Sequence, residues 1–100
     1  MRYGRKQKMK YKIIESNKFK KSLKRCAKRG CDKNLLYKIV ADYLSDGKPL
    51  PAKYKAHKLK GEYEGCWECH ITSDWLLIWQ QNDTELILIL TDTGTHSDLF

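Results

Sequence analysis

Long apolar segments are absent from the sequence. The two longest uninterrupted apolar runs have five residues each, at 75–79 and 86–90. A transmembrane helix needs about 20 such residues, so we expect no membrane span and no membrane partner. The basic residues at the N-terminus are not followed by a hydrophobic segment, so we expect no secretory signal and a cytoplasmic location.

Lysine and arginine are absent after Lys60, although the net charge of the chain is +8. Residues 1–30 contain 13 Lys and Arg and one acid, residues 31–60 contain seven Lys and three Asp, and residues 61–100 contain eight acids. A cation excess of this size predicts a polyanionic partner, either a nucleic acid or an acidic protein segment. The alternative is a solvated helix face that keeps a small protein soluble.

Internal repeats and low-complexity segments are also absent. Apolar residues make up 41% of the chain and aromatic residues 11%, which is too much for a disordered chain. A length of 100 residues leaves room for one hydrophobic core. We therefore expect one domain over residues 9–100, preceded by a basic N-terminal extension at residues 1–8.

The apolar pattern predicts the element order β-α-α-β-β-β. A cap at Ser16 and a stop at Gly30 delimit the first helix, and Asp32 and Gly47 delimit the second. Their short connection predicts an antiparallel helical hairpin. Strands are expected at 9–15, 62–71, 75–81 and 85–91, with an exposed basic loop at 48–61 and no further element in the tail. The expected fold is α+β, with the N-terminal helical hairpin packed on one face of a mostly antiparallel four-stranded sheet.

The expected strands indicate where a site would lie. The strand at 85–91 is apolar on both faces, so we expect it in the interior of the sheet. In the strand at 62–71, the polar set Cys66, Glu68 and His70 alternates with an apolar set. We place the polar set, which includes a titratable imidazole, on the face of the sheet that the helices leave open.

Four cysteines suggest two metal or cofactor interpretations, and we favour neither. Cys66, Cys69 and the following histidine have the spacing of a c-type haem attachment site, whose chemistry belongs outside the cytoplasm. Zinc would need that pair together with Cys26 and Cys31. Residues i and i+3 of a strand point to opposite faces, which disfavours a shared metal. We expect reduced, mostly buried cysteines, no metal and no cofactor.

The three histidines, His57, His70 and His96, all lie in the last 44 residues. One lies in the basic loop and the other two near strand ends, which can converge at one edge of a sheet. Cleavage of RNA by its own 2′-OH needs a base for that proton and an acid for the leaving 5′-oxygen, and imidazoles can be either near neutral pH. Asp74 could orient one imidazole, and Trp75 could stack on a base. Acidic residues show no metal-ligand spacing, so we expect metal-free chemistry.

Three segments together resemble the YafQ-type toxins of the RelE/ParE superfamily: Tyr54–Gly61, Glu68–Ile78 and Thr93–Phe100. With the element order, the resemblance extends over about residues 9–100. It implies a bacterial type II toxin, a ribosome-dependent endoribonuclease that cuts messenger RNA in the decoding site. It also implies a cognate antitoxin of the DinJ/RelB kind. The antitoxin would silence the toxin, and the complex would repress its own operon, so that operator DNA is bound only through the complex.

The resemblance also implies roles for individual residues. His57, His70, Asp74 and His96 occupy catalytic positions of the family. It leaves open which imidazole is the base and which the acid, and His96 is our candidate for the acid. Trp75 and Phe100 occupy aromatic positions near the substrate. In the family a cationic surface binds ribosomal RNA. The resemblance therefore implies that the candidate RNA-binding residues here are Lys20, Lys21, Lys24, Arg25, Lys28, Lys53 and Lys55.

One position departs from the family pattern. The family has an arginine immediately before Thr-Gly-Thr-His, where this chain has Asp92. A cation there would neutralise the substrate phosphate, whereas a carboxylate repels it. We therefore expect an attenuated enzyme, unless Asp92 points into a harmless turn. The alternative is a catalytically inactive relative that binds an antitoxin and acts only as a co-repressor. A third interpretation is a zinc-bound nucleic-acid module, which predicts stoichiometric metal, and a gyrase poison of the ParE branch is disfavoured because the three histidine motifs point to RNA cutting.

Overall fold

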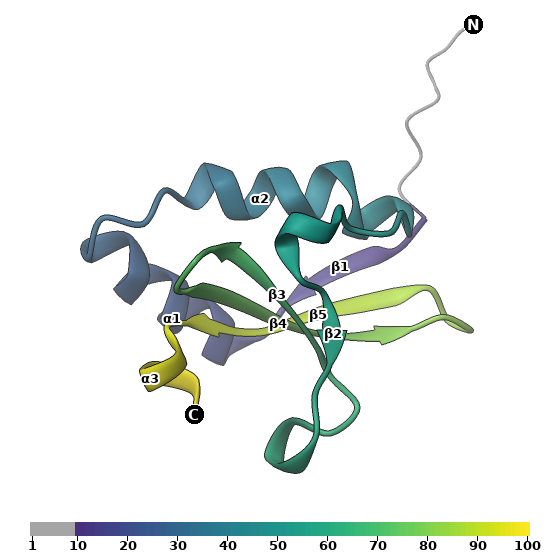
Figure 1. Ribbon diagram of the computed structural model, residues 1–100. Coiled ribbons are helices and arrows are strands. Elements are labelled where there is room, and N and C mark those ends of the chain that lie inside the picture. Colours follow the sequence, from purple (N-terminus) through teal and green to yellow (C-terminus); the bar gives the residue numbers. More distant parts are fainter. Residues whose placement is uncertain (1–9) are drawn as a thin grey trace, which may run out of the picture.

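The computed structural model describes residues 10–100, in which five strands form one sheet in the order β1-β5-β4-β3-β2 (Figure 1). The strands are β1 Lys12–Glu15, β2 His57–Lys58, β3 Trp67–Thr72, β4 Trp75–Asn82 and β5 Ile87–Gly94. The helices are α1 Asn17–Lys28, α2 Lys33–Asp42 and α3 His96–Leu99, with single 3-10 turns at Leu44–Asp46, Ala52–Tyr54 and Gly61–Tyr63. The predicted α+β class is confirmed. The expected extension at 1–8 and the start of the first strand at Met9 lie outside the described residues.

The sheet has five strands rather than the four predicted. Strand β1 pairs in parallel with β5, and the other neighbours pair antiparallel. The additional strand, β2, lies in the segment predicted as an exposed basic loop, where His57 and Lys58 pair with Glu68 and Trp67. Two residues are too few to show an alternating pattern, so the sequence could not reveal this strand.

The two long helices begin at the predicted caps. The Ser16 hydroxyl accepts a hydrogen bond from the Phe19 N–H, and the Asp32 carboxylate accepts one from the Asn34 N–H. Each of the two helices packs on the sheet, α1 mainly on β5 and α2 on β3. The two helices were predicted to form a hairpin and pack along each other, but their main contacts are with the sheet. In residues 10–100 no helix is both long and apolar enough to cross a membrane.

Apolar side chains form one core on each face of the sheet. On the face covered by α1 and α2, the core contains Phe19, Leu36, Leu77, Trp79 and Leu88, among others. A smaller cluster on the opposite face contains Cys66, Leu76, Ile78 and Leu99. We call this second face the histidine face, because it also carries His70. The alternation predicted for β3, with Trp67, Cys69 and Ile71 toward the helices, is confirmed.

Several element boundaries differ from the prediction. Strand β3 begins at Trp67 rather than at residue 62, because a 3-10 turn and Gly65, with φ of +92°, interrupt the extended chain before it. The tail was expected to be irregular but forms α3. Its capping box, in which Thr95 and Asp98 bond each other's backbone N–H, stabilises even a single turn.

A β-bulge in β5 decides which face its last residues occupy. Leu90 pairs with Trp79, but Asp92 pairs with Ile78, so Thr91 is an extra residue between them. Leu88 and Leu90 face the helices. Strict alternation would place residue 92 with them, and the bulge places Asp92 on the histidine face instead.

Candidate active site

The register aligns polar residues from distant segments on the histidine face. One row across the sheet consists of His57 on β2, Glu68 on β3, Ile78 on β4 and Asp92 on β5. Adjacent strands lie about 4.8 Å apart, so the polar residues of this row lie within roughly 15 Å. The next row contains His70, which pairs with Leu76, and Leu76 pairs in turn with Gly94.

Two of the three predicted histidines meet near the C-terminal end of β3. The ring centroids of His70 and His96 are 5.9 Å apart. His96 is the first residue of α3, and its Nδ1 lies 3.6 Å from Oδ1 of Asp74 in the turn between β3 and β4. The fold thus brings the imidazole of His96 to an imidazole and a carboxylate that lie more than 20 residues earlier in the chain. A substrate can reach this group, because the side chains of His96 and Asp74 are 58% and 70% exposed and His70 is partly exposed.

The third histidine, His57, is held by two acceptors. Its Nδ1 donates to the Lys55 carbonyl at 2.9 Å, and its Nε2 lies 3.2 Å from Oε1 of Glu68. A carbonyl and an ionised carboxylate can only accept hydrogen bonds. One extra proton must therefore lie between His57 and Glu68 for both contacts to be hydrogen bonds. The pair can therefore hold a proton on the same face as His70, which follows Glu68 by two residues on β3.

Sequence reasoning placed Glu68 on this face but gave it no role. Its side chain is only 3% exposed, and its Oε2 has no hydrogen-bond partner. A buried carboxylate oxygen without a partner is costly, and the contact of Oε1 with His57 offsets only part of that cost. The signal available in the sequence was an acid at a strand position otherwise occupied by buried residues.

The aromatic residues lie in two different environments. Phe100 is 60% exposed, and its ring centroid is 6.0 Å from that of His96 and 5.5 Å from that of Tyr63. It is available to contact a substrate. Trp75 is 4% exposed and belongs to the core under the helices. This burial leaves no face on which a base could stack, so the expected stacking role does not fit its position.

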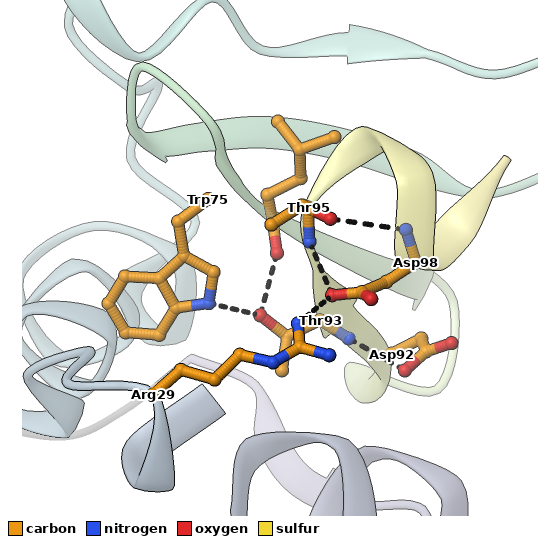
Figure 2. A network of polar contacts seen from close by, with 7 residues as sticks. Arg29, Trp75, Asp92, Thr93, Thr95 and Asp98 are labelled. Carbon is orange, nitrogen blue, oxygen red and sulfur yellow. Dashed lines mark hydrogen bonds and ion pairs between the residues drawn. The ribbon is translucent and has the colours of Figure 1, made fainter. Parts of the chain in front are cut away.

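Trp75 instead supports Thr93 at the end of β5 (Figure 2). Its indole N–H donates to the Thr93 hydroxyl at 2.9 Å, and that hydroxyl donates to the Leu76 carbonyl at 2.6 Å. These two bonds fix the end of β5 against β4. The chain leaves this fixed point through Gly94 and enters α3.

Helix α3 is fastened to the end of α1. Arg29 Nη1 lies 2.8 Å from Oδ2 of Asp98, which also accepts the Thr95 N–H at 3.0 Å (Figure 2). Hydrogen bonds from the Thr95 backbone and then from Arg29 hold the pKa of Asp98 below its ordinary value. The stabilisation from these bonds is therefore present above the ordinary carboxyl pKa and is lost as the pH falls through the lowered value.

Gly94 is required by the close approach of α3. A Cβ atom at this position would lie 2.8 Å from Cβ and 2.9 Å from Oδ2 of Asp98. We expect Gly94→Ala to push α3 away from β5 and displace His96. A misplacement of about 1 Å can lower a catalysed rate by about 100-fold, whereas overpacking costs about 1–3 kcal/mol of unfolding free energy. The activity of this site and urea unfolding check this, with Ser97→Ala as control; unchanged activity of Gly94→Ala would contradict it.

The predicted RNA-binding cations are exposed on two elements. Those of α1 are Lys20, Lys21, Lys24, Arg25 and Lys28, and those near the Ala52–Tyr54 turn are Lys53 and Lys55. The turn borders an open hollow of about 560 Å³ that is also lined by Leu35, Tyr54 and His70. Lys53 and Lys55 thus lie beside His70, which with His96 and Asp74 forms what we call the histidine cluster. The cations of α1 form a separate surface.

Asp92 lies beside the site and not in a harmless turn. It is 3% exposed. Its Oδ1 accepts the Thr93 N–H at 2.8 Å, and its Oδ2 lies 3.5 Å from Nζ of Lys18. Sequence reasoning did not single out Lys18, because nothing in the pattern indicated that the first turn of α1 would reach this face.

The cysteines do not form a site. All four are free, and Cys66 and Cys69 belong to the cores on opposite faces of the sheet, so the two cannot share a metal. Burial raises the pKa of the Cys69 thiol to about 12, which keeps it protonated and unreactive. Across residues 10–100, no three His, Cys, Asp or Glu side chains are grouped so that they could hold a metal ion.

The chain belongs to the toxins of bacterial type II toxin–antitoxin systems, as a family model that covers most of its length shows. Within this class, the chain is a member of the YafQ family. The model of the family described as "Bacterial toxin of type II toxin-antitoxin system, YafQ" matches residues 11–100. The predicted family is thereby confirmed.

Individual relatives agree with this assignment. The chain is 36% identical over 88 residues to the mRNA interferase toxin YafQ of Escherichia coli K12, which covers 88% of this chain and 94% of that protein. A metal-bound toxin from Helicobacter pylori is 44% identical with a TM-score of 0.81, covering 90% of this chain and 99% of that one. YafQ in the E. coli DinJ–YafQ complex is 36% identical with a TM-score of 0.80, covering 90% and 98%.

Proposed function

We propose that this toxin is an endoribonuclease that cuts messenger RNA on the ribosome by acid–base catalysis without a metal ion. The observation that supports this most strongly is the approach of His70 and His96 to 5.9 Å beside Asp74. The E. coli relative is named as an mRNA interferase. The cluster lies on an exposed face that a single RNA strand can reach.

The reaction needs two proton transfers around one phosphodiester. A base takes the proton of the 2′-OH, which attacks the adjacent phosphorus, and an acid gives a proton to the leaving 5′-oxygen. We assign the acid to His96, whose ring Asp74 orients through Nδ1 and whose Nε2 remains available to the substrate. His70 takes the 2′-OH proton, or the His57–Glu68 pair takes it when the two residues do not already share an extra proton, and Phe100 contacts a neighbouring base.

We propose that Asp92 attenuates this activity. Its carboxylate lies on the histidine face, where it repels the phosphate, and the ion pair with Lys18 offsets part of this repulsion. As the reaction proceeds, negative charge grows on the phosphate oxygens, and each missing donor weakens catalysis.

The partners follow from charge and from the relatives. We propose an antitoxin of the DinJ kind, because a relative of this fold has been solved with DinJ. Operator DNA would be bound through that complex. The cations of α1 are suited to ribosomal RNA, and they are equally able to receive an acidic antitoxin segment.

Ribosome binding should weaken steeply with salt. Phosphate contacts release counterions, so the logarithm of the binding constant falls by about 0.7–0.9 per contact for each tenfold rise in salt. We expect the double variant Lys20→Gln, Lys24→Gln to lower both affinity and this slope, with Lys38→Gln, which pairs with Asp42, as control. Binding measured at several salt concentrations checks this, and a flat salt response would contradict the role of α1.

A second candidate function is favoured by Asp92 itself. A chain with a carboxylate at this position could be catalytically inactive and serve only as an antitoxin-binding co-repressor. Expression without an antitoxin, followed by growth measurement and mapping of messenger RNA ends, separates the two functions. The endoribonuclease predicts growth arrest with new 5′ ends, and the inactive partner predicts neither.

A further inference from the structure

The close approach of Lys18 to Asp92 suggests how this chain handles a substrate phosphate. Asp92 is nearly buried, and of the described residues Lys18 is the cation within ion-pair distance of it. The side chain of Lys18 is 65% exposed. A buried anion therefore holds the end of a side chain that is otherwise free to move.

The fold explains why helix α1 can deliver a cation to the opposite face of the sheet. Strand β1 pairs with β5 only as far as Glu15 and Leu90. Ser16 then fastens the start of α1 to this point, because its backbone N–H bonds the Leu90 carbonyl and its hydroxyl bonds the Thr91 carbonyl. Beyond Leu90 the edge of β5 is free of β1, and Lys18 passes around it.

Lys18 borders the histidine cluster through two aromatic rings. Its Nζ lies 5.8 Å from the ring centroid of Tyr63, which contacts Phe100, and Phe100 contacts His96. Neither of its partners takes up all three of its N–H donors. These contacts place Lys18 on the same face as His96, two aromatic rings away, with N–H donors left for a phosphate oxygen that comes within reach of its long side chain.

Three of the other cations near the site have partners of their own, whereas Lys55 lines the hollow beside His70. Arg29 is held by Asp98. Lys58 lies over the Trp67 ring, and Lys53 lies over the Tyr54 ring. No lysine or arginine follows Lys60 in the chain. Lys18 is thus the cation that the end of β5 itself positions.

We propose that Lys18 is the catalytic cation of this toxin: it binds the scissile phosphate and neutralises the charge that develops there, and Asp92 is the residue that positions it. The proposal rests on the proposed ribonuclease function. Lys18 keeps its proton throughout, and its Nζ exchanges one acceptor, Asp92, for another, a phosphate oxygen. Because the same ammonium serves both anions, catalysis is weaker than with a cation that has no buried partner.

The test is single-turnover cleavage of messenger RNA on programmed ribosomes at saturating toxin, so that the rate reports on the bound complex. We expect Lys18→Gln to lower this rate by about 10- to 100-fold, in line with the loss of one donor to a developing anion. Lys18→Arg should retain most of the rate. Lys33→Gln, an exposed lysine at the start of α2, is the control and should cut like the wild type.

Repeating the Lys18→Gln measurement in a protein that also carries Asp92→Arg makes the test specific. When Asp92→Arg supplies its own cation, Lys18→Gln should cost no more than about 3-fold, because residues sharing one partner are not additive. Equal losses in both backgrounds, or none in either, would overturn the role of Lys18. His96→Ala reports separately on the proposed function. If His96→Ala cuts normally, the acid–base mechanism fails; if His96→Ala is inactive while Lys18→Gln cuts like the wild type, only the Lys18 proposal fails.

Discussion

His96→Ala should reduce cleavage of messenger RNA on programmed ribosomes by about 100- to 10,000-fold, the usual contribution of a positioned acid or base. The imidazole stands 5.9 Å from that of His70 and next to Asp74. The alanine variant leaves the Thr95 cap of α3 in place. The loss is therefore expected in the chemical step and not in folding.

The control for this prediction lies in the same helix. Ser97→Ala changes the next residue of α3 but is not placed in the site, and it should cut at the wild-type rate. Circular dichroism and ribosome binding should be the same for both variants. Cleavage by His96→Ala at the wild-type rate would show that the leaving oxygen receives its proton from another group.

Asp92→Arg should have the next largest effect, an increase in the same cleavage rate of about 10- to 100-fold. The change removes a carboxylate that repels the phosphate and adds a donor that stabilises the growing charge, and a single such donor is worth about 100- to 1,000-fold in other enzymes. We expect less than that full value because Lys18 already supplies part of the effect and loses its ion-pair partner in the variant.

Asp92→Asn separates the two parts of this effect. It removes the negative charge without adding a cation, and its Oδ1 can still accept the Thr93 N–H. Its rate should lie between those of the wild type and the arginine variant. If all three proteins cut equally, position 92 does not influence the phosphate.

The features that depend on neighbouring residues could be predicted from the sequence. The caps at Ser16 and Asp32 and the alternation of β3 are all local patterns, and the structure confirms them. Features that depend on strand pairing were not predicted. Strand β2 exists only because β3 lies beside it, and the parallel pairing of β1 with β5 joins opposite ends of the chain.

The candidate site shows the same division. Its histidines were identified from motifs, and their approach follows from two strand ends meeting at one edge. The face occupied by Asp92 depends on the bulge at Thr91, which alternation cannot reveal. The burial of Trp75 and the reach of Lys18 around the sheet edge are consequences of packing between distant segments. Such contacts leave no periodic trace in the sequence.

Helix α1 touches the C-terminal segment at both of its ends, through Lys18 on Asp92 and through Arg29 on Asp98. The two contacts are 11 residues apart, so about 16 Å of rigid helix joins them. A ligand that tilts α1 would disturb the position of the Lys18 ammonium and, through Arg29 and Asp98, that of the His96 imidazole. It would not have to bind between these two groups. A ligand bound only to the outer surface of α1 could therefore inhibit the toxin without contacting the site.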